Sequence, residues 1–335
     1  MGKMGMVIVF GMSLASMFLG YKINQSHVSS VTNMSGYFKY TMARNIAHAA
    51  VDVALHELEM GNDSTELFTG SVMGGTYTVD VVFVRDTVDM ASRGYYVDTT
   101  YSIALRLERY AKPFPEVQGA VVLPVNRVGF TMQGSTSIDG RDHDINGNLQ
   151  PGAESKAGVV TLSEADSVAV AAFSNRIMGS PQVSIDTAMS DPLKFVDEYI
   201  ANADYTYNAG VYGSNATWGS AESPAIVVCD AGSGTVEFTG SIEGWGILVV
   251  KGKLGLAGTF KFHGLVLVYQ EGASEAELSM GVGASKIVGG ILMDGAEGSK
   301  FTMKGNAQVV YSSAALDNAE HMKKLMAYRI LSWYE

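Results

Sequence analysis

Acidic and amide side chains alternate in one short stretch of the chain, residues 139–148. In a calcium loop the oxygen ligands occupy alternate positions, and a glycine such as Gly147 allows the sharp turn between them. The position that carries the bidentate carboxylate in such a loop is Ala153, with Glu154 one place later. The alternative is a plain Asp/Asn/Gly turn between two strands, since turns prefer these residues. Calcium is the one cofactor that the sequence indicates, with these candidate ligands: Asp142, Asp144, Asn146 and Asn148.

Two other groupings of residues are candidates for catalytic sites. Carbohydrate-active β proteins use clustered carboxylates, and Asp139, Asp142 and Asp144 form such a cluster. No second cluster follows it, because the later strand positions are Ile, Leu and Val. Cys229 and His263 are a nucleophile and a base in principle, but a lone cysteine after an apolar run is more often a buried small hydrophobe. The sequence therefore predicts no catalytic residues and a protein that is not an enzyme.

The composition indicates a membrane segment joined to a β-rich region. Of 335 residues, 47% are hydrophobic and only 17% are charged, and the chain has 38 glycines against 7 prolines. So much glycine without a collagen period is typical of tight turns and closely stacked strands. The net charge of -11 repels phosphate backbones, so nucleic acid is excluded as a partner.

The N-terminal stretch Met4–Tyr21 carries no charge and matches the length of a membrane-spanning helix. A cleaved secretory signal is one alternative, with a weak cleavage site at residues 13–15. However, the apolar run continues through Phe18 and Leu19, where a cleavage region should become polar. A buried core helix is a second alternative, but such a helix rarely lacks a polar stripe. We therefore predict a retained transmembrane helix.

The helix is expected to continue well beyond the apolar stretch. From Lys22 to Met60 there is no proline, the only glycine is Gly36, and apolar residues recur at helical spacing from Ile46 to Leu58. One helix from Gly5 to Met60 would be about 80 Å long. A single small domain cannot cover that length, so its exposed part needs partners.

The rest of the chain is predicted to be β structure. Gly75–Val84 and Tyr95–Leu107 alternate as strands with one buried face. Glycine pairs six residues apart then recur, and fully apolar strands follow three of them, which is typical of a short β-solenoid with glycines at its corners. The alternative is a glycine-rich β-sandwich in which the spacing is coincidental. The pairs are Gly134/Gly140, Gly240/Gly246, Gly258/Gly264 and Gly283/Gly289.

The predicted fold class is α+β, with four parts. Residues 1–62 form the transmembrane anchor and amphipathic stalk helix, and residues 63–115 an antiparallel β headpiece. Residues 116–313 form the mainly β, solenoid-like domain, with an insertion around 141–236. Apolar spacing in Ala314–Glu335 predicts an amphipathic C-terminal helix that caps the stack.

A basic leader, an apolar half-helix, an amphipathic half-helix and then a β domain resemble the type IV pilin and pseudopilin superfamily. Lys3-Met4-Gly5 followed by an apolar run is similar to the site cut by prepilin peptidase, which implies cleavage between Gly5 and Met6. Phe10 stands at the fifth mature position, where the superfamily usually has Glu. The resemblance implies an assembly helix made of Met6, Val7, Ile8, Val9, Phe10, Leu14, Met17, Phe18 and Leu19.

The resemblance extends to the second half of the chain. Gly246–Val268 resembles a stretch, GILVVxGxLxxxGxFxFxGLVxV, that pilin-like pilus-assembly proteins often carry near the C-terminus. Ile138–Asp142 matches an Ile-Asp-Gly-Arg-Asp-like stretch of the same proteins. These motifs are structural glycines and strands, so they imply family membership and no activity.

The resemblance implies a structural and adhesive subunit of a pilus or pseudopilus filament. It would be anchored in the inner membrane before assembly and extracellular afterwards, with itself or other pilin-like subunits as partners. One alternative is a single-pass envelope protein whose solenoid binds a surface polysaccharide or protein. Another is a membrane scaffold similar to bactofilins. Lys3 on one side of the apolar stretch and Lys22, Lys39 and Arg44 on the other favour no orientation, so the exterior placement follows from the resemblance alone.

Overall fold

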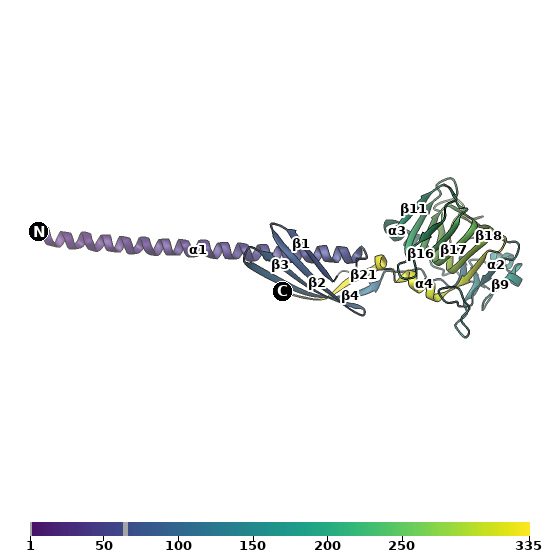
Figure 1. Cartoon of the computed structure of the whole chain (residues 1–335), viewed down its shortest axis with the longest axis horizontal. Helices are drawn as coiled ribbons and strands as arrows, with labels where there is room; N and C mark the ends of the chain where they lie inside the picture. Colours follow the sequence, from purple (N-terminus) through teal and green to yellow (C-terminus); the bar gives the residue numbers. More distant parts are fainter. Residues whose placement is uncertain (1, 63–65) are drawn as a thin grey trace. The chain divides into compact units, whose positions relative to one another are not determined.

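The computed structural model describes residues 2–62 and 66–335, in two compact units (Figure 1). The first unit comprises residues up to Tyr110 together with Ala327–Glu335, and the second comprises Ala111–Met326. The second unit is therefore inserted into the first. Residues 63–65, where the predicted headpiece begins, lie outside the described residues. The second unit begins at Ala111, near the predicted end of the headpiece at residue 115.

Helix α1 spans Gly2–Glu59 and confirms the predicted long N-terminal helix. Its outer part is exposed as far as Phe38, while the part from Ala43 to Leu58 has one buried face. From Met6 onward the helix is long and apolar enough to cross a membrane, and its most apolar window has no burial. After Glu59, Gly61 has a φ of +85°, the left-handed conformation that commonly ends a helix.

The inner part of α1 packs on a sheet in the order β1-β2-β3-β4-β21. Strands β1 to β4 are antiparallel neighbours. One face supplies the core against the helix, including Val79, Val81, Met90 and Leu105. The bounds are β1 Leu67–Val72, β2 Gly75–Val84, β3 Thr87–Tyr96, β4 Thr99–Ala111 and β21 Met326–Tyr334.

Gly94 lets α1 approach β3 closely. A Cβ atom at this position would lie 2.3 Å from the Ala43 carbonyl oxygen and 2.6 Å from the Ala47 nitrogen. Nearby, the Ser92 hydroxyl donates a hydrogen bond of 2.8 Å to the Ala47 carbonyl. The contact is made by backbone atoms, which cannot rotate away as a side chain can.

We expect Gly94→Ala to lower the free energy of unfolding of the first unit by about 1–3 kcal/mol, the usual cost of overpacking. Gly70→Ala is the matched control, because its Cβ would meet only the Tyr77 ring, a side chain that can move. Protease resistance of residues 66–110 measures the effect. Equal resistance of the two variants would contradict it.

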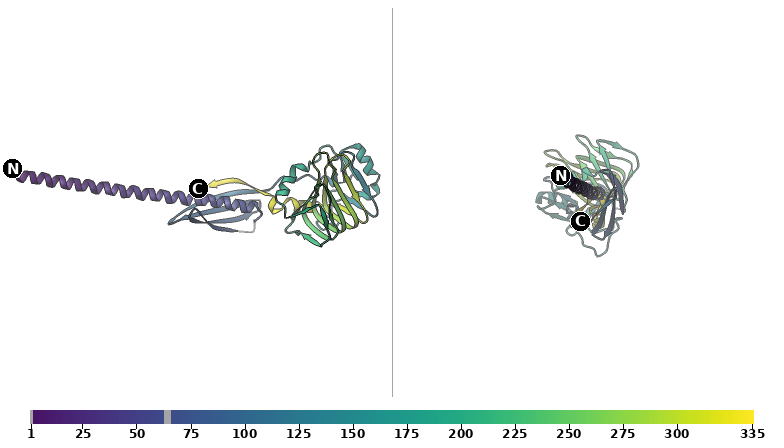
Figure 2. Two further views of the ribbon diagram at one scale, coloured as in Figure 1. Left: turned by 90° about the horizontal axis from the view of Figure 1, so that it is seen from above. Right: turned by 90° about the vertical axis from the view of Figure 1, so that its left-hand side faces the viewer.

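The second unit is built on a large, curled sheet whose neighbouring strands are parallel (Figure 2). Its main path runs β10-β8-β5-β18-β17-β16-β14-β11. The strands are β5 Gly119–Leu123, β6 Gly129–Met132, β7 Ser137–Asp139, β8 Ala157–Thr161, β9 Ile177–Met178, β10 Val183–Ile185, β11 Tyr205–Asn208, β12 Gly210–Tyr212, β13 Ala216–Trp218, β14 Ala225–Asp230, β15 Val236–Phe238, β16 Ser241–Lys251, β17 Lys253–Tyr269, β18 Glu277–Met293, β19 Lys300–Met303 and β20 Gln308–Tyr311.

The chain enters this sheet in the middle and fills it in two directions. It begins at β5, moves outward through β8 to β10, and then passes through helix α3 (Leu193–Ala201) to β11 at the opposite edge. From β11 it returns through β14, β16 and β17 to β18, which pairs with β5. Residues 141–236, predicted as an insertion, therefore supply strands at both edges of the sheet.

Glycines form columns across the strands, as their repeated spacing predicts. Gly246, Gly264 and Gly289 lie side by side in register on β16, β17 and β18, with φ values of +117°, +132° and +139°. A Cβ on Gly264 would lie 2.0 Å from the Gly246 carbonyl oxygen, and one on Gly289 would lie 2.0 Å from that of Gly264. Only glycine has both the conformation and the space for this stacking.

The apolar strands after these glycines are buried on both faces. Every residue of β5 and β8 is buried, and so are Ile247–Val250 and Leu265–Val268. Helix α4 (Ser313–Glu320) packs on β16, β17 and β18, which explains the burial of the outward side chains there. Strands of this kind read as continuous apolar runs because a parallel sheet is usually covered on both sides.

A short C-terminal helix is present, but it ends at Glu320 and does not extend to Glu335. Met326–Tyr334 forms β21, which pairs with β4 in the first unit. Three interactions explain why the strand prevails over the helical apolar spacing. The β4 edge offers backbone partners, Arg329 pairs with Glu108, and the Trp333 ring stacks on His48 at 5.4 Å. Tertiary pairing has overridden the local helical pattern.

Candidate functional site

The outer part of α1 presents a continuous apolar surface. All of the residues predicted for the assembly helix are exposed there, with Met17 at 77% and Phe18 at 70%. Gly5 and Met6, the predicted cleavage pair, lie within the same helix. A Cβ atom added at Gly11 or Gly20 would meet no described atom within 4 Å, apart from the nearby backbone of the helix itself. The exposed predicted residues are Met6, Val7, Ile8, Val9, Phe10, Leu14, Met17, Phe18 and Leu19.

Helix α1 therefore has two parts, one packed against the sheet and one exposed. Around Ala47 and Ala50 it buries a narrow face of small residues under the sheet. Between Met6 and Tyr21 its large apolar side chains are exposed, and the next charged residue is Lys22. An exposed apolar surface of this extent marks a membrane or protein interaction site.

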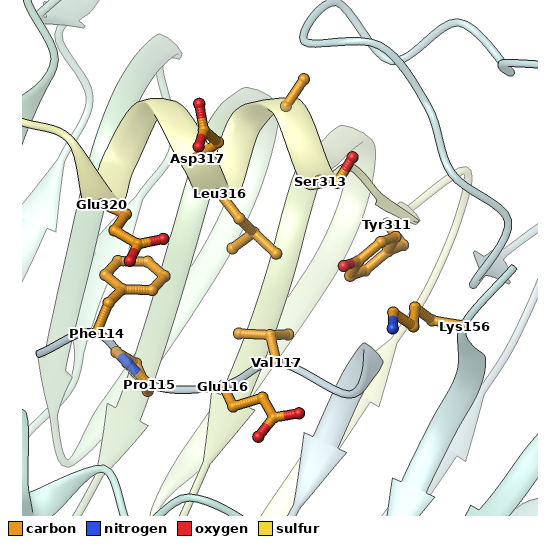
Figure 3. A pocket seen from close by; sticks show the side chains of 11 residues that line it. Phe114, Pro115, Glu116, Val117, Lys156, Tyr311, Ser313, Leu316, Asp317 and Glu320 are labelled. Carbon is orange, nitrogen blue, oxygen red and sulfur yellow. The ribbon is translucent and has the colours of Figure 1, made fainter. Parts of the chain in front are cut away.

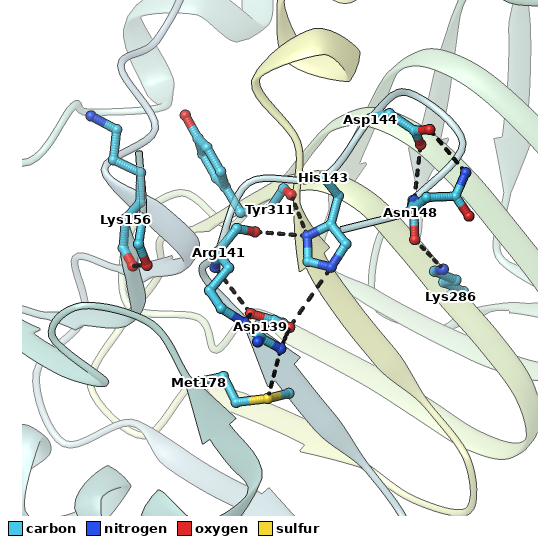
Figure 4. A network of polar contacts seen from close by, with 11 residues as sticks. Asp139, Arg141, His143, Asp144, Asn148, Lys156, Met178, Lys286 and Tyr311 are labelled. Carbon is cyan, nitrogen blue, oxygen red and sulfur yellow. Dashed lines mark hydrogen bonds and ion pairs between the residues drawn. The ribbon is translucent and has the colours of Figure 1, made fainter. Parts of the chain in front are cut away.

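In the second unit the acidic stretch forms an ion pair between Asp139 and Arg141 and a turn at Asp144 (Figure 4), whereas Asp142 binds the start of α4. Asp139 is 4% exposed and accepts hydrogen bonds from both Nε and Nη2 of Arg141, at 2.9 and 2.6 Å. Burial raises the pKa of Asp139, but the hydrogen bonds from Arg141 outweigh it and hold the pKa below its usual value. His143 Nδ1 lies 2.7 Å from the Arg141 carbonyl oxygen, so it donates there, and Nε2 lies 3.7 Å from Asp139.

The predicted calcium ligands have different partners. Asp142 accepts hydrogen bonds from the Ser313 nitrogen at 2.8 Å and hydroxyl at 2.7 Å, at the start of α4. Asp144 accepts from the backbone nitrogens of Asn146 and Asn148, both at 2.9 Å, and from the Asn148 side-chain amide. These hydrogen bonds lower the pKa of Asp144, led by those from Asn148. The arrangement supports a rigid turn, and calcium at this loop stays a prediction.

His263, considered in the sequence only as a partner of Cys229, has a different setting. Its ring stacks on Trp245 at 3.7 Å, and Nδ1 donates to the Ile145 carbonyl oxygen at 2.6 Å. Nε2 is buried without a hydrogen-bond partner, 3.8 Å from Glu243. Cys229 lies on β14, where it pairs with Val250 of β16, whereas His263 on β17 pairs with Trp245 of β16. Burial raises the pKa of the Cys229 thiol. The structure does not bring the two together, so they form no nucleophile–base pair.

We expect the second unit to lose stability as the pH falls below about 6.5, the ordinary pKa of histidine. Burial lowers the pKa of His263, the nearby Lys261 and Lys286 lower it further, and the Ile145 hydrogen bond and Glu243 oppose them. Because the folded pKa lies below the unfolded one, this contribution is complete above pH 6.5 and is lost as the pH falls.

The thermal unfolding midpoint measured from about pH 7.5 to pH 5 tests this, with His263→Gln as the comparison. The midpoint of His263→Gln should be lower than that of the wild type at neutral pH, since the stacking of the His263 ring on Trp245 is lost. It should also change less with pH. Parallel curves for the two proteins would contradict the role of His263.

A pocket of about 660 Å³ lies beside α4 (Figure 3). Its apolar wall includes Phe114, Val117 and Leu316, and carboxylates from Glu116 and Glu320 stand at its rim. In the part of the chain that the structure describes, the grouping with the spacing of metal ligands is Asp317, Glu320 and His321. Asp317 and His321 are exposed and pair with each other at 3.3 Å, as two residues one helical turn apart commonly do.

No protein-family model matches this chain, and no curated protein matches its sequence. Among solved structures, the chain is similar to the crystal structure of the competence-associated pilin ComZ from Thermus thermophilus. The likeness covers 88% of this chain and 97% of that one, with 10% identity and a TM-score of 0.24. A TM-score this low carries no argument about function.

Proposed function

We propose that this chain is a pilin-like subunit that assembles through α1 into a filament on the outside of the cell envelope. The observation that carries the proposal is the apolar surface from Met6 to Tyr21, which is exposed along its whole length. Before assembly this surface lies in the membrane, and afterwards it lies against copies of itself or other pilin-like subunits. Compared with exposure to water, burial of a large apolar side chain in either environment contributes about 1.5–3 kcal/mol.

The division of α1 supports this proposal over a plain membrane anchor. An anchor requires only the apolar stretch, whereas here the helix continues without interruption into the sheet of the first unit. The sheet is thereby fixed rigidly to the assembling surface. A subunit needs such a rigid connection to hold its outer domain at a constant position along a fibre.

The second unit is proposed to be a short β-solenoid displayed on the filament. Each of its turns contributes one strand to the buried face, and the glycine columns at Gly246 and Gly258 mark the corners. Its surface role is structural and adhesive, toward a polysaccharide or protein of the surroundings. We assign it no catalytic residue.

Electron microscopy of material sheared from cells, combined with N-terminal sequencing of the purified subunit, tests the function. Fibres that contain this chain, beginning at Met6, are the expected result and would also establish cleavage after Gly5. A chain that stays in membranes with Met1 intact, and never enters fibres, would instead support a single-pass envelope protein or a bactofilin-like scaffold.

Calcium binding at residues 142–148 is proposed separately from the filament. With calcium at millimolar levels, the thermal midpoint should rise in the wild type and stay constant in Asp144→Asn, which removes one carboxylate ligand. Asp317→Asn is the control, because it removes a carboxylate from the other candidate grouping. A calorimetric titration that shows no heat of calcium binding, together with an unchanged thermal midpoint, would contradict calcium binding at this loop.

A further inference from the structure

The curled sheet of the second unit has two ends, which differ in how they are protected. At one end lie β9 and β10, and at the other lie β11, β12 and β13. Each strand of the second group pairs on one side only, with β14, β15 and β16 respectively. Their other sides carry backbone groups that are free to pair with a further strand.

The end formed by β9 and β10 has several features that block further pairing. The two strands contain only Ile177–Met178 and Val183–Ile185, and Pro181 stands between them. Helix α2 (Glu164–Ala171) packs on β8 and β10. Short strands, proline and a covering helix are the usual means by which proteins protect a sheet edge.

The strands at the opposite end are also short, since β12 and β13 have three residues each, but other features differ. Residues 205–218, all of them described, include no charged residue and no proline, and most are exposed. Val211 is 68% exposed, and Tyr205 is 39% exposed. Beside them is a hollow of about 200 Å³ lined by aromatic rings, including those of Tyr207, Tyr212 and Phe238.

We infer that this uncharged edge, residues 205–218, pairs with the same edge of a second copy of the chain. The net charge of -11 makes two copies repel each other over most of their surface. In a two-fold contact the same surface lies on both sides and residues at the axis meet their own copies, so an edge of one charge sign would repel its copy. Residues 177–185 at the other end also lack charge, but Pro181 and helix α2 protect them, which leaves residues 205–218 as the edge that fits a second copy.

The two-fold symmetry makes Val211 the centre of the contact. It is the middle residue of β12, which is the second of the three strands in chain order. A two-fold axis through β12 sets this strand antiparallel to its copy and brings the two Val211 residues together. Glu237, the neighbour of Val211 on β15, is the first charge behind the edge.

Disulfide formation by Val211→Cys, in the purified full chain in detergent, tests this geometry. Under mild oxidation we expect a disulfide-linked dimer as the main product. Ile185→Cys is the matched control, because it places an exposed cysteine at the protected end. The native Cys229 is buried and should add no background. Linking of Val211→Cys no faster than Ile185→Cys would overturn the inference.

Val211→Lys tests the energetics of the same contact. It places two like charges together at the axis, while Glu237 on the next strand can pair with the new side chain within the monomer. The dissociation constant of the dimer should rise roughly tenfold or more, and Val211→Thr should leave it nearly unchanged. A dimer that persists in Val211→Lys would overturn the inference.

The result does not depend on the proposed filament, because helix α1 is identical in all of these variants. Association through α1 would be unaffected by every substitution at position 211. Loss of the dimer in Val211→Lys with fibres intact supports the edge contact alone. Failure to find fibres leaves the disulfide result as a separate measurement.

Discussion

Gly264→Ala should unfold the second unit or leave it marginally stable. The substitution places a Cβ 2.0 Å from the Gly246 carbonyl oxygen and forces an L side chain to a φ of +132°. The conformational strain costs about 1–3 kcal/mol, and overpacking against backbone adds about 1–3 kcal/mol. The total is a large share of the 5–15 kcal/mol that typically stabilises a domain.

Urea unfolding followed by tryptophan fluorescence measures this effect. In a Trp333→Phe background, the remaining Trp218 and Trp245 both report on the second unit. Gly272→Ala is the matched control, since its φ is +73° but no atom lies within 4 Å of the added Cβ. The difference between the two variants reports the steric clash together with the added strain of the φ of +132°. Similar midpoints for both would show that the glycine column does not require glycine.

Leu14→Asp should remove the chain from membranes and abolish assembly. Leu14 lies near the middle of the uncharged stretch and is 52% exposed. A carboxylate at the centre of a membrane helix costs about 2.5–3.5 kcal/mol, which corresponds to roughly a hundredfold change in partitioning. The same charge would be buried without a partner in a bundle of α1 helices.

The fraction of the chain that stays with membranes after an alkaline wash, together with counts of fibres, measures both outcomes. Ser30→Asp is the control, because it adds the same charge to the polar part of α1 beyond the apolar stretch. Normal retention and normal fibres in Leu14→Asp would contradict the role of the apolar surface.

The long helix and the glycine columns were predictable because each depends on local chemistry. Continuous helical character without proline from Lys22 onward required no tertiary information, and the structure confirms it. The recurrence of Gly246, Gly264 and Gly289 before apolar strands likewise reflected a conformation that only glycine adopts readily. In both cases the residue type itself carries the constraint.

The remaining features depended on partners far away in the chain. Ile330 and Trp333 have helical spacing, yet they form a strand because β4 offers an open edge. The setting of His263 is created by Ile145, which approaches from a distant loop, so no local pattern revealed it. The separate roles of Asp142 and Asp144 also depend on Ser313, at the start of α4.

The placement of Ala111–Met326 between β4 and β21 has a consequence for how the protein matures. The two ends of this segment are held together, since the Lys112 nitrogen donates to the Leu325 carbonyl oxygen at 2.8 Å. During synthesis, β21 emerges only after the whole inserted segment. Truncated or stalled chains would therefore lack the fifth strand and leave the β4 edge unpaired, so the first unit is completed only after the whole second unit has been made.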